Sequence, residues 1–142
     1  MRSTGSGHTS RNQFDPFTVV EPAFNRRETR VAEREVRIAR TEALFRDVNE
    51  RIAESADRFN VHDAEFVCEC ADPECADRVP ATLDQYEDVR SDGTHFLLTA
   101  GHELPEVERV VKRPHRRSVV VEKFNSVVVR TVRRLNPRAD VI

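Results

Sequence analysis

The sequence has few of the side chains that build a large hydrophobic core. Among 142 residues there is no Trp, one Tyr and eight Phe, whereas 34% of the residues are charged. A chain of this length supplies about one domain, and the core of that domain must be small. We therefore expect a single small core that benefits from an additional cross-link.

Long apolar runs are also missing. The first residues, MRSTGSGHTSRNQ, contain no apolar segment typical of a secretory signal, and no later stretch approaches the roughly 20 apolar residues of a membrane span. The sequence thus predicts a soluble, cytoplasmic protein with no membrane partner. Its four glycines form no phosphate-binding loop, and no nucleophile lies in a recognisable catalytic motif. We therefore predict that the protein is not an enzyme.

Charge is divided unevenly along the chain, although the net charge is only −2. Residues 60–102 carry 10 acidic and 2 basic groups, whereas residues 103–142 carry 5 acidic and 10 basic groups. This pattern suits either pairing between the two segments or a bipolar surface. It weakens the case for a nucleic-acid-binding role of the whole domain, because such domains are usually basic overall.

The composition divides the chain into four parts. Residues 1–25 are rich in Ser, Thr, Gly and Asn and predict a disordered leader. Residues 26–59 predict a long amphipathic helix, residues 60–124 a zinc-stapled α+β domain, and residues 125–142 a basic C-terminal tail. The tail contains the run Val127-Val128-Val129, which leaves open whether it forms a strand or a helix.

The predicted helix over residues 26–59 carries an unusual apolar pattern. Apolar residues recur at a strict interval of seven, at Val31, Ile38, Phe45, Ile52 and Phe59. The other positions of a coiled-coil seam are mostly polar. Two interpretations remain. The face that contains Leu44, Phe45, Val48, Ile52 and Phe59 covers a sheet of the same chain, or residues 26–59 mediate self-association or binding of a protein partner.

From residue 60 onward the pattern becomes that of short strands. Residues 65–70 alternate, so that Phe66, Cys68 and Cys70 lie on one face and Glu69 on the other. Further strands are predicted at 78–81 and 95–99, and residues 107–112 and 118–124 predict a hairpin. The segment 82–85, Thr-Leu-Asp-Gln, fits a capping box that begins a helix. The predicted fold class is α+β, with a long N-terminal helix followed by a small, mainly antiparallel sheet and one short helix.

Three cysteines lie within eight residues, at Cys68, Cys70 and Cys75, and His102 follows in a predicted loop. The spacing C-x-C-x4-C-x26-H offers the four Cys and His ligands of a structural zinc site, so zinc is the predicted cofactor. Two other interpretations stay open, namely reduced cysteines used as small apolar residues and a redox or catalytic thiol.

His102 is the least secure of these ligands, because a loop histidine is often only hydrogen-bonded or solvated. His62, His95 or Asp72 are the alternatives for the fourth position. A set of four protein ligands leaves no position for an activated water, which argues against a hydrolase.

The basic end of the chain offers a second candidate site. Its charges could contact the phosphates of a nucleic acid, or they form a solvated hairpin tip and tail. Aromatic residues for base stacking are rare among them. The candidate residues are Lys112, Arg113, Arg116, Arg117, Arg130, Arg133 and Arg134.

One set of residues resembles a family of small uncharacterised actinobacterial proteins. That family has the pattern F-x-C-E-C…C…E-Y-E…P-G-H-E…V-V-E-K after a long charged helix, and the resemblance covers residues 36–123. The matching residues are Phe66, Cys68, Glu69, Cys70, Cys75, Tyr86, Glu87, Gly101, His102, Glu103 and the segment 120–123. Ala100 and Gln85 depart from the pattern where Pro and Glu are expected. The resemblance implies that the Cys and His positions belong to one module, and it implies no activity.

The sequence therefore predicts a noncatalytic zinc-binding interaction or regulatory domain. The alternative is a nucleic-acid-associated regulator that uses the basic hairpin and tail. A cysteine- or zinc-dependent enzyme is a more distant third hypothesis.

Overall fold

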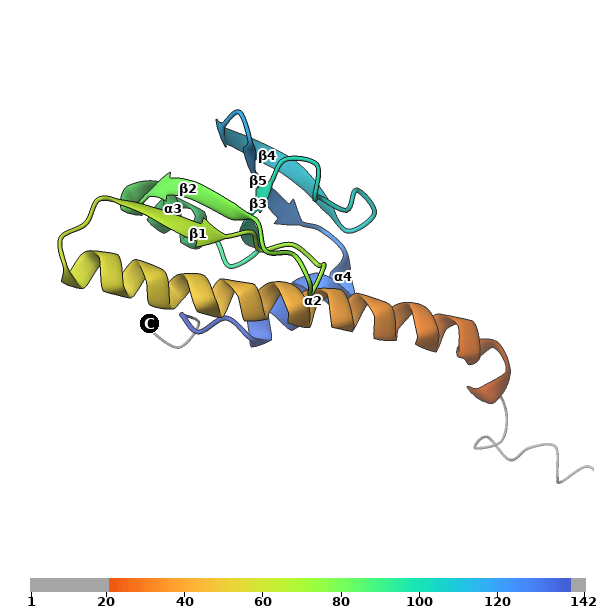
Figure 1. Ribbon diagram of the computed structural model, residues 1–142. Helices are drawn as coiled ribbons and strands as arrows, with labels where there is room; N and C mark the ends of the chain where they lie inside the picture. Colours follow the sequence, from red (N-terminus) through yellow and green to blue (C-terminus); the bar gives the residue numbers. More distant parts are fainter. Residues whose placement is uncertain (1–20, 139–142) are drawn as a thin grey trace, which may run out of the picture. The chain divides into compact units, whose positions relative to one another are not determined.

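The computed structural model describes residues 21–138 and shows an α+β fold (Figure 1). The chain divides into two compact units, residues 1–34 and residues 35–142, and all that follows on packing concerns the second unit. The elements in order are α2 (Glu21–Arg58), β1 (Asp63–Val67), β2 (Arg78–Thr82), α3 (Leu83–Arg90), β3 (His95–Thr99), β4 (Glu108–His115), β5 (Ser118–Lys123) and α4 (Ser126–Arg134).

The long helix is confirmed, and it begins at Glu21, five residues before the predicted start. Pro22 stands in its first turn, where a missing backbone N–H removes no helical hydrogen bond. Residues 1–20 of the predicted leader lie outside the described residues. No helix within residues 21–138 combines the length and apolar character needed to cross a membrane.

The face that α2 turns toward the domain differs from the one that the sequence predicts. The buried residues of this helix are mostly small or charged, and they are Ile38, Ala39, Glu42, Ala43, Arg46, Asn49, Ala53 and Ala56. Leu44 and Phe59 are 62% and 68% exposed, so the prediction that they cover a sheet is wrong for these two residues. Ile52, from the same predicted set, does pack against the core. Two of the buried polar side chains form hydrogen bonds within the domain: Asn49 bonds Val67 and Glu69, and Arg46 bonds the carbonyl of Val132.

Two small antiparallel sheets follow the helix. In the first, β1 pairs with β2, with Phe66 opposite Val79. In the second, the strand order is β3-β5-β4, with Leu97 opposite Val120. The predicted hairpin is confirmed as β4 and β5, which meet at the turn Arg116-Arg117. The runs Phe96-Leu97-Leu98 in β3 and Val119-Val120-Val121 in β5 are buried on both faces, and such short apolar and β-branched runs favour strands.

The segment Cys68–Cys70 joins the two sheets. The backbone N–H of Glu69 donates to the carbonyl of Leu97, and Glu69 Oε1 accepts from the N–H of Leu97 at 2.9 Å. The N–H of Thr99 donates to Cys68 Sγ at 3.1 Å. These bonds satisfy backbone groups along β3 that would otherwise form an open sheet edge.

Two short helices complete the fold. Thr82 caps α3 with the predicted capping box, in which its side chain and that of Gln85 bond each other's backbone. The C-terminal segment forms the helix α4, capped by the side chain of Asn125, so the open choice between strand and helix is settled. Val128 and Val132 are buried one turn apart, which gives α4 its inner face.

Charged side chains are buried at the centre of the domain. Lys123 Nζ lies 2.8 Å from Glu42 Oε1 and also contacts Glu108, and all three side chains are fully buried. Arg46 donates to the carbonyls of Gly93 and Val132, at 2.8 Å each. The core is therefore held by apolar packing and by an internal charge network.

Candidate metal centre

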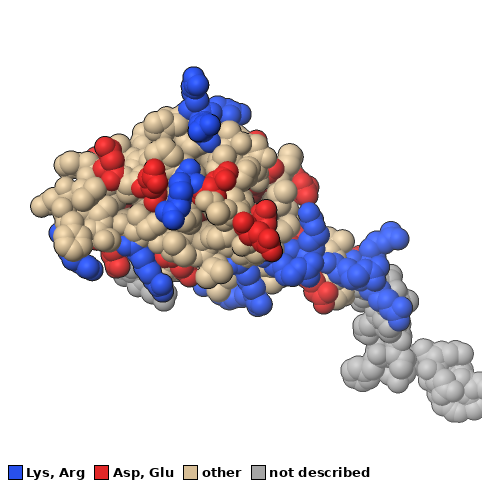
Figure 2. Space-filling view, viewed as in Figure 1, with Lys and Arg blue, Asp and Glu red and all other residues tan. Residues whose placement is uncertain are grey.

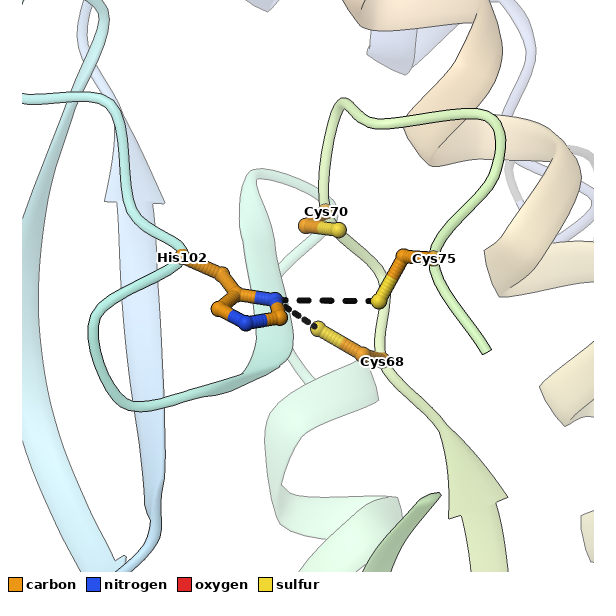
Figure 3. Close-up of side chains that lie close together, drawn as sticks. All are labelled: Cys68, Cys70, Cys75 and His102. Atoms are coloured by element: carbon orange, nitrogen blue, oxygen red, sulfur yellow. Dashed lines mark hydrogen bonds between the residues drawn. The ribbon is translucent and has the colours of Figure 1, made fainter. Parts of the chain in front are cut away.

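Cys68, Cys70, Cys75 and His102 converge on one point (Figure 3). Their ligand atoms all lie within 4.8 Å of one another. Nδ1 of His102 is 3.5 Å from Cys68 Sγ and 3.7 Å from Cys75 Sγ. The four residues predicted as ligands are thus brought together, and the cluster fits a Cys3His site.

The distances match those of a tetrahedral metal site. With metal–sulfur bonds of about 2.3 Å and a metal–nitrogen bond of about 2.0 Å, tetrahedral geometry separates the sulfur and nitrogen atoms by about 3.5 Å. The observed separations of 3.5 and 3.7 Å are close to that distance. One imidazole nitrogen has a single lone pair or hydrogen in the ring plane, so it cannot bond both sulfur atoms well. A metal ion on that lone pair would satisfy both contacts.

Local structure explains how the ligands meet. Cys68 follows directly after β1, and Cys75 is returned by a turn in which its N–H donates to the carbonyl of Asp72 at 3.0 Å. His102 lies in the turn after β3, where its N–H donates to the carbonyl of Thr99 at 3.0 Å. Gly101 adopts a φ of 95°, a conformation that glycine accepts readily.

The thiol groups differ in acidity. The pKa of Cys68 is lowered, first by a hydrogen bond from the Cys70 thiol and also by the N–H of Thr99. The pKa of Cys70, which donates that bond, is raised by it and by burial, and burial also raises the pKa of Cys75. Cys68 is therefore the first of the three to become a thiolate, the form that binds a metal.

Asp77 orients the histidine from outside the cluster. Its Oδ2 lies 3.4 Å from His102 Nε2, the ring nitrogen that faces away from the sulfur atoms. A carboxylate at this position favours the tautomer that carries hydrogen on Nε2, which leaves Nδ1 free to bind a metal. The arrangement is the usual one for a histidine that ligates zinc.

Sequence reasoning missed Glu69, which was expected on the outer face of its strand. Its side chain is fully buried, and its Oε2 accepts from the Tyr86 hydroxyl at 2.7 Å and from Asn49 Nδ2 at 2.8 Å. Burial raises the pKa of this carboxyl group. The sheet that contains β3 covers the face on which Glu69 lies, a face that a single sheet would leave exposed to solvent. The signal for this burial in the sequence is the position of Glu69 between the two ligand residues Cys68 and Cys70.

The alternatives to His102 lie elsewhere or are already engaged. His62 is exposed, and Asp72 Oδ1 accepts the N–H of Glu74 in the turn before Cys75. His95 belongs to a separate cluster, with Nε2 3.5 Å from Asp92 and 3.3 Å from Glu122. These two carboxylates already accept hydrogen bonds from Thr94 and Arg109, so ion pairing explains this second cluster.

The residues proposed to contact nucleic acid are separated in space. Arg116 and Arg117 form the β4–β5 turn, whereas Arg130, Arg133 and Arg134 lie on α4, which Figure 1 shows far from that turn. Lys112 pairs with Asp88 at 2.5 Å. Arg113, near the end of β4, is exposed. The seven side chains therefore do not form one continuous surface.

The fold and the cluster define an α+β protein whose two sheets meet at a Cys3His site. Comparison with known proteins finds no family model, no curated protein and no solved structure that matches the chain. The site geometry is therefore the basis for what we propose about function.

Proposed function

We propose that this protein is a cytoplasmic, noncatalytic interaction domain stapled by one zinc ion. The observation that carries the proposal is that the Cys68–Cys70 segment provides two ligands and, through Glu69 and Cys68, the hydrogen bonds that join both sheets. An ion bound there would fix the junction between the sheets. The small core gains the cross-link that its composition requires.

The donor set supports zinc as the ion. Three thiolates and one imidazole are soft and intermediate ligands that suit zinc in a tetrahedral structural site and disfavour magnesium or calcium. A reducing compartment keeps the three cysteines as thiols, which fits their close spacing without a disulfide. Four protein ligands fill the coordination sphere, so no position is left for a reactive water.

The partner that best fits the remaining surface is a second copy of this chain. Phe45 and Ile52 are half-buried at the border of the domain, and Leu44 and Val48 are exposed beside them. The domain's own core uses only part of the seven-residue stripe, since Ile38 is buried and Ile52 packs against the core. The two ends of the stripe, Val31 and Phe59, are 49% and 68% exposed. A seven-residue apolar period matches another helix with the same period, as in a coiled coil.

A matched pair of histidine variants tests the metal site. We expect His102→Ala to lower bound zinc well below one ion per chain, whereas His95→Ala should keep one ion, as measured by native mass spectrometry and elemental analysis. The two changes remove the same side chain from two clusters, so the comparison separates ligation from loss of an imidazole. The proposal would be contradicted if purified wild-type protein contained no metal and if all three of its thiols reacted freely in a thiol titration.

Self-association has its own test. Light scattering with size-exclusion chromatography should show a dimer for the wild-type chain and a monomer for Leu44→Glu/Val48→Glu. The control is Arg51→Gln/Ser55→Glu, which lowers the net charge by the same two units at exposed positions on neighbouring turns of α2. A monomeric wild-type chain at about 100 μM, well above the Kd of a stable dimer, would contradict this part of the proposal alone.

A further inference from the structure

A cleft of about 710 Å³ opens beside the metal centre. Its walls come from β2 with the residue before it, the end of β3 and the β4–β5 turn. A volume of this size is typical of sites for small molecules, which range from about 300 to 1,000 Å³. The lining residues that matter below are Asp77, Arg78, Thr99, Arg116, Arg117 and Ser118.

The cleft carries positive charge, and the arginines that supply it form no ion pairs with the described carboxylates. Arg78, Arg116 and Arg117 are exposed, and none of them pairs with a carboxylate among the residues that the structure describes. Figure 2 shows a cluster of basic side chains over the β4–β5 turn. Asp77, the one acidic residue that lines the cleft, already faces His102. Elsewhere on the same hairpin, by contrast, Arg109 is paired with Glu122.

Two hydroxyl groups in the cleft wall have no hydrogen-bond partner. Thr99 Oγ1 and Ser118 Oγ are both buried and unpaired. The two residues face each other in the register of β3 and β5, so they stand at the same level of the wall. A buried hydroxyl without a partner costs about 1–3 kcal/mol, and such groups call for an explanation in a folded protein. A ligand rich in acceptor oxygens would supply the missing partner.

The geometry points to this cleft as a binding site for a phosphate group carried by a small molecule. Arginine binds phosphate through two parallel hydrogen bonds, and hydroxyl donors complement the remaining oxygens. Three arginines match the two negative charges of a phosphate monoester or the larger charge of a diphosphate. Among residues 21–138, no Phe, Tyr or Trp lines the cleft, so these residues offer no platform for base stacking of a single-stranded nucleic acid.

The metal centre and the cleft share two residues. Asp77 contacts the ligand His102, and the N–H of Thr99 donates to the ligand Cys68. Binding of the phosphate group does not require the ion to be zinc, and it does not require a dimer. The cleft goes beyond the proposed structural role, because it gives the stapled domain a small-molecule ligand.

Titration of the full metal-loaded chain with inorganic pyrophosphate, followed by amide chemical shifts, tests the inference. We expect saturable shifts at residues 77–79, 99–100 and 115–118. Arg116→Gln/Arg117→Gln should weaken binding at least about tenfold, since each lost bond is charge-assisted. The matched control Arg130→Gln/Arg134→Gln removes the same two charges from α4 and should change the affinity by less than about twofold.

Further arms guard against a nonspecific effect. Ser118→Ala should weaken pyrophosphate binding about threefold or more, because it removes a neutral hydrogen bond. Absence of saturable shifts at about 10 mM pyrophosphate would overturn the inference. An equal loss of pyrophosphate affinity in the cleft variant and in the α4 variant would also overturn it. The same holds if a single-stranded oligonucleotide binds more tightly than pyrophosphate and both double variants weaken that binding. Amide spectra and metal content of each variant confirm that the fold is intact.

Discussion

Two devices hold this small domain together, and they differ in where their charge comes from. The Cys3His cluster needs an ion from outside, whereas the network of Glu42, Lys123 and Glu108 is built entirely from the chain's own side chains. Both join segments that are distant in sequence. The metal cluster depends on the concentration of free ion, whereas the buried network depends on pairing between charges that are removed from water. The two should therefore respond differently to chelation, substitution and pH.

Removal of the ion should have the largest effect. If free zinc exceeds its Kd about a thousandfold, binding stabilises the folded state by about 4 kcal/mol, and a chelator abolishes that contribution. We expect the urea midpoint to fall when the chelator is added and to recover with added zinc. Cys75→Ser protein should be insensitive to the chelator. Equal midpoints with and without chelator would mean that the charge network alone sustains the fold.

Substitution of the buried lysine should have an effect of about the same size. Lys123→Met leaves the carboxylates of Glu42 and Glu108 buried without a cation, and loss of one partner in a buried pair costs about 3–5 kcal/mol. The free energy of unfolding measured in urea checks this value. Arg109→Met is the control, because its ion pair with Glu122 is exposed and should contribute less than about 1 kcal/mol.

The two devices should respond to pH in opposite directions. Burial raises the pKa of Glu42 from 4.5 to about 7, against the opposing effect of Lys123. Its Oε1 lies 2.8 Å from Lys123 Nζ, so burial and the cation act on this pKa in opposite directions, and burial has the larger effect. The folded state therefore holds a proton that the unfolded chain has already released between pH 4.5 and 7. This stabilising contribution is present below pH 4.5 and is lost as the pH rises through about 7.

Metal binding follows the reverse trend, because its ligands must lose protons and the cluster loosens as pH falls. The difference in unfolding free energy between the wild type and Glu42→Gln should accordingly change by roughly 2 kcal/mol between pH 4.5 and 7. Measurements in the presence of a chelator separate the contribution of Glu42 to the unfolding free energy from that of the metal. A difference that stays constant over that range would show that Glu42 is ionised throughout.

The residue behind the histidine should give the smallest effect. Asp77→Asn weakens the carboxylate contact to His102 Nε2 without removing a ligand. Changes of this kind typically reduce metal affinity about tenfold or more. Competition with a zinc-binding dye measures it, and Asp72→Asn serves as a control in the same loop, where the amide oxygen can still accept the N–H of Glu74.

Local patterns carried most of what the sequence could predict. The three cysteines lie within eight residues, and the Thr82 capping box needs only four, so both were visible without any tertiary contact. His102 was harder, because a loop histidine gains its role only from the turn that brings it to the sulfur atoms. The hairpin and the third strand are predicted by short apolar runs that turn residues separate.

The buried charges were not predictable in the same way. Arg46 bonds the carbonyl of Val132, 86 residues away, and a charged residue near the middle of an amphipathic helix is normally assigned to solvent. The apolar stripe of α2 is visible in the sequence, but which of its residues become buried depends on tertiary contacts with the sheets. Glu69 was missed for the same reason, since its partners lie on α2, α3 and β3.

The spacing of the four ligands also orders events in time. The three thiol groups leave the ribosome within eight residues of each other, and His102 follows 27 residues after Cys75. At a synthesis rate of about 5–20 residues per second, the imidazole emerges roughly 1–5 s later. The nascent chain can therefore hold an ion with sulfur alone before β3 exists. Arrival of His102 would then complete coordination at the moment when β3 becomes available to the Cys68–Cys70 segment.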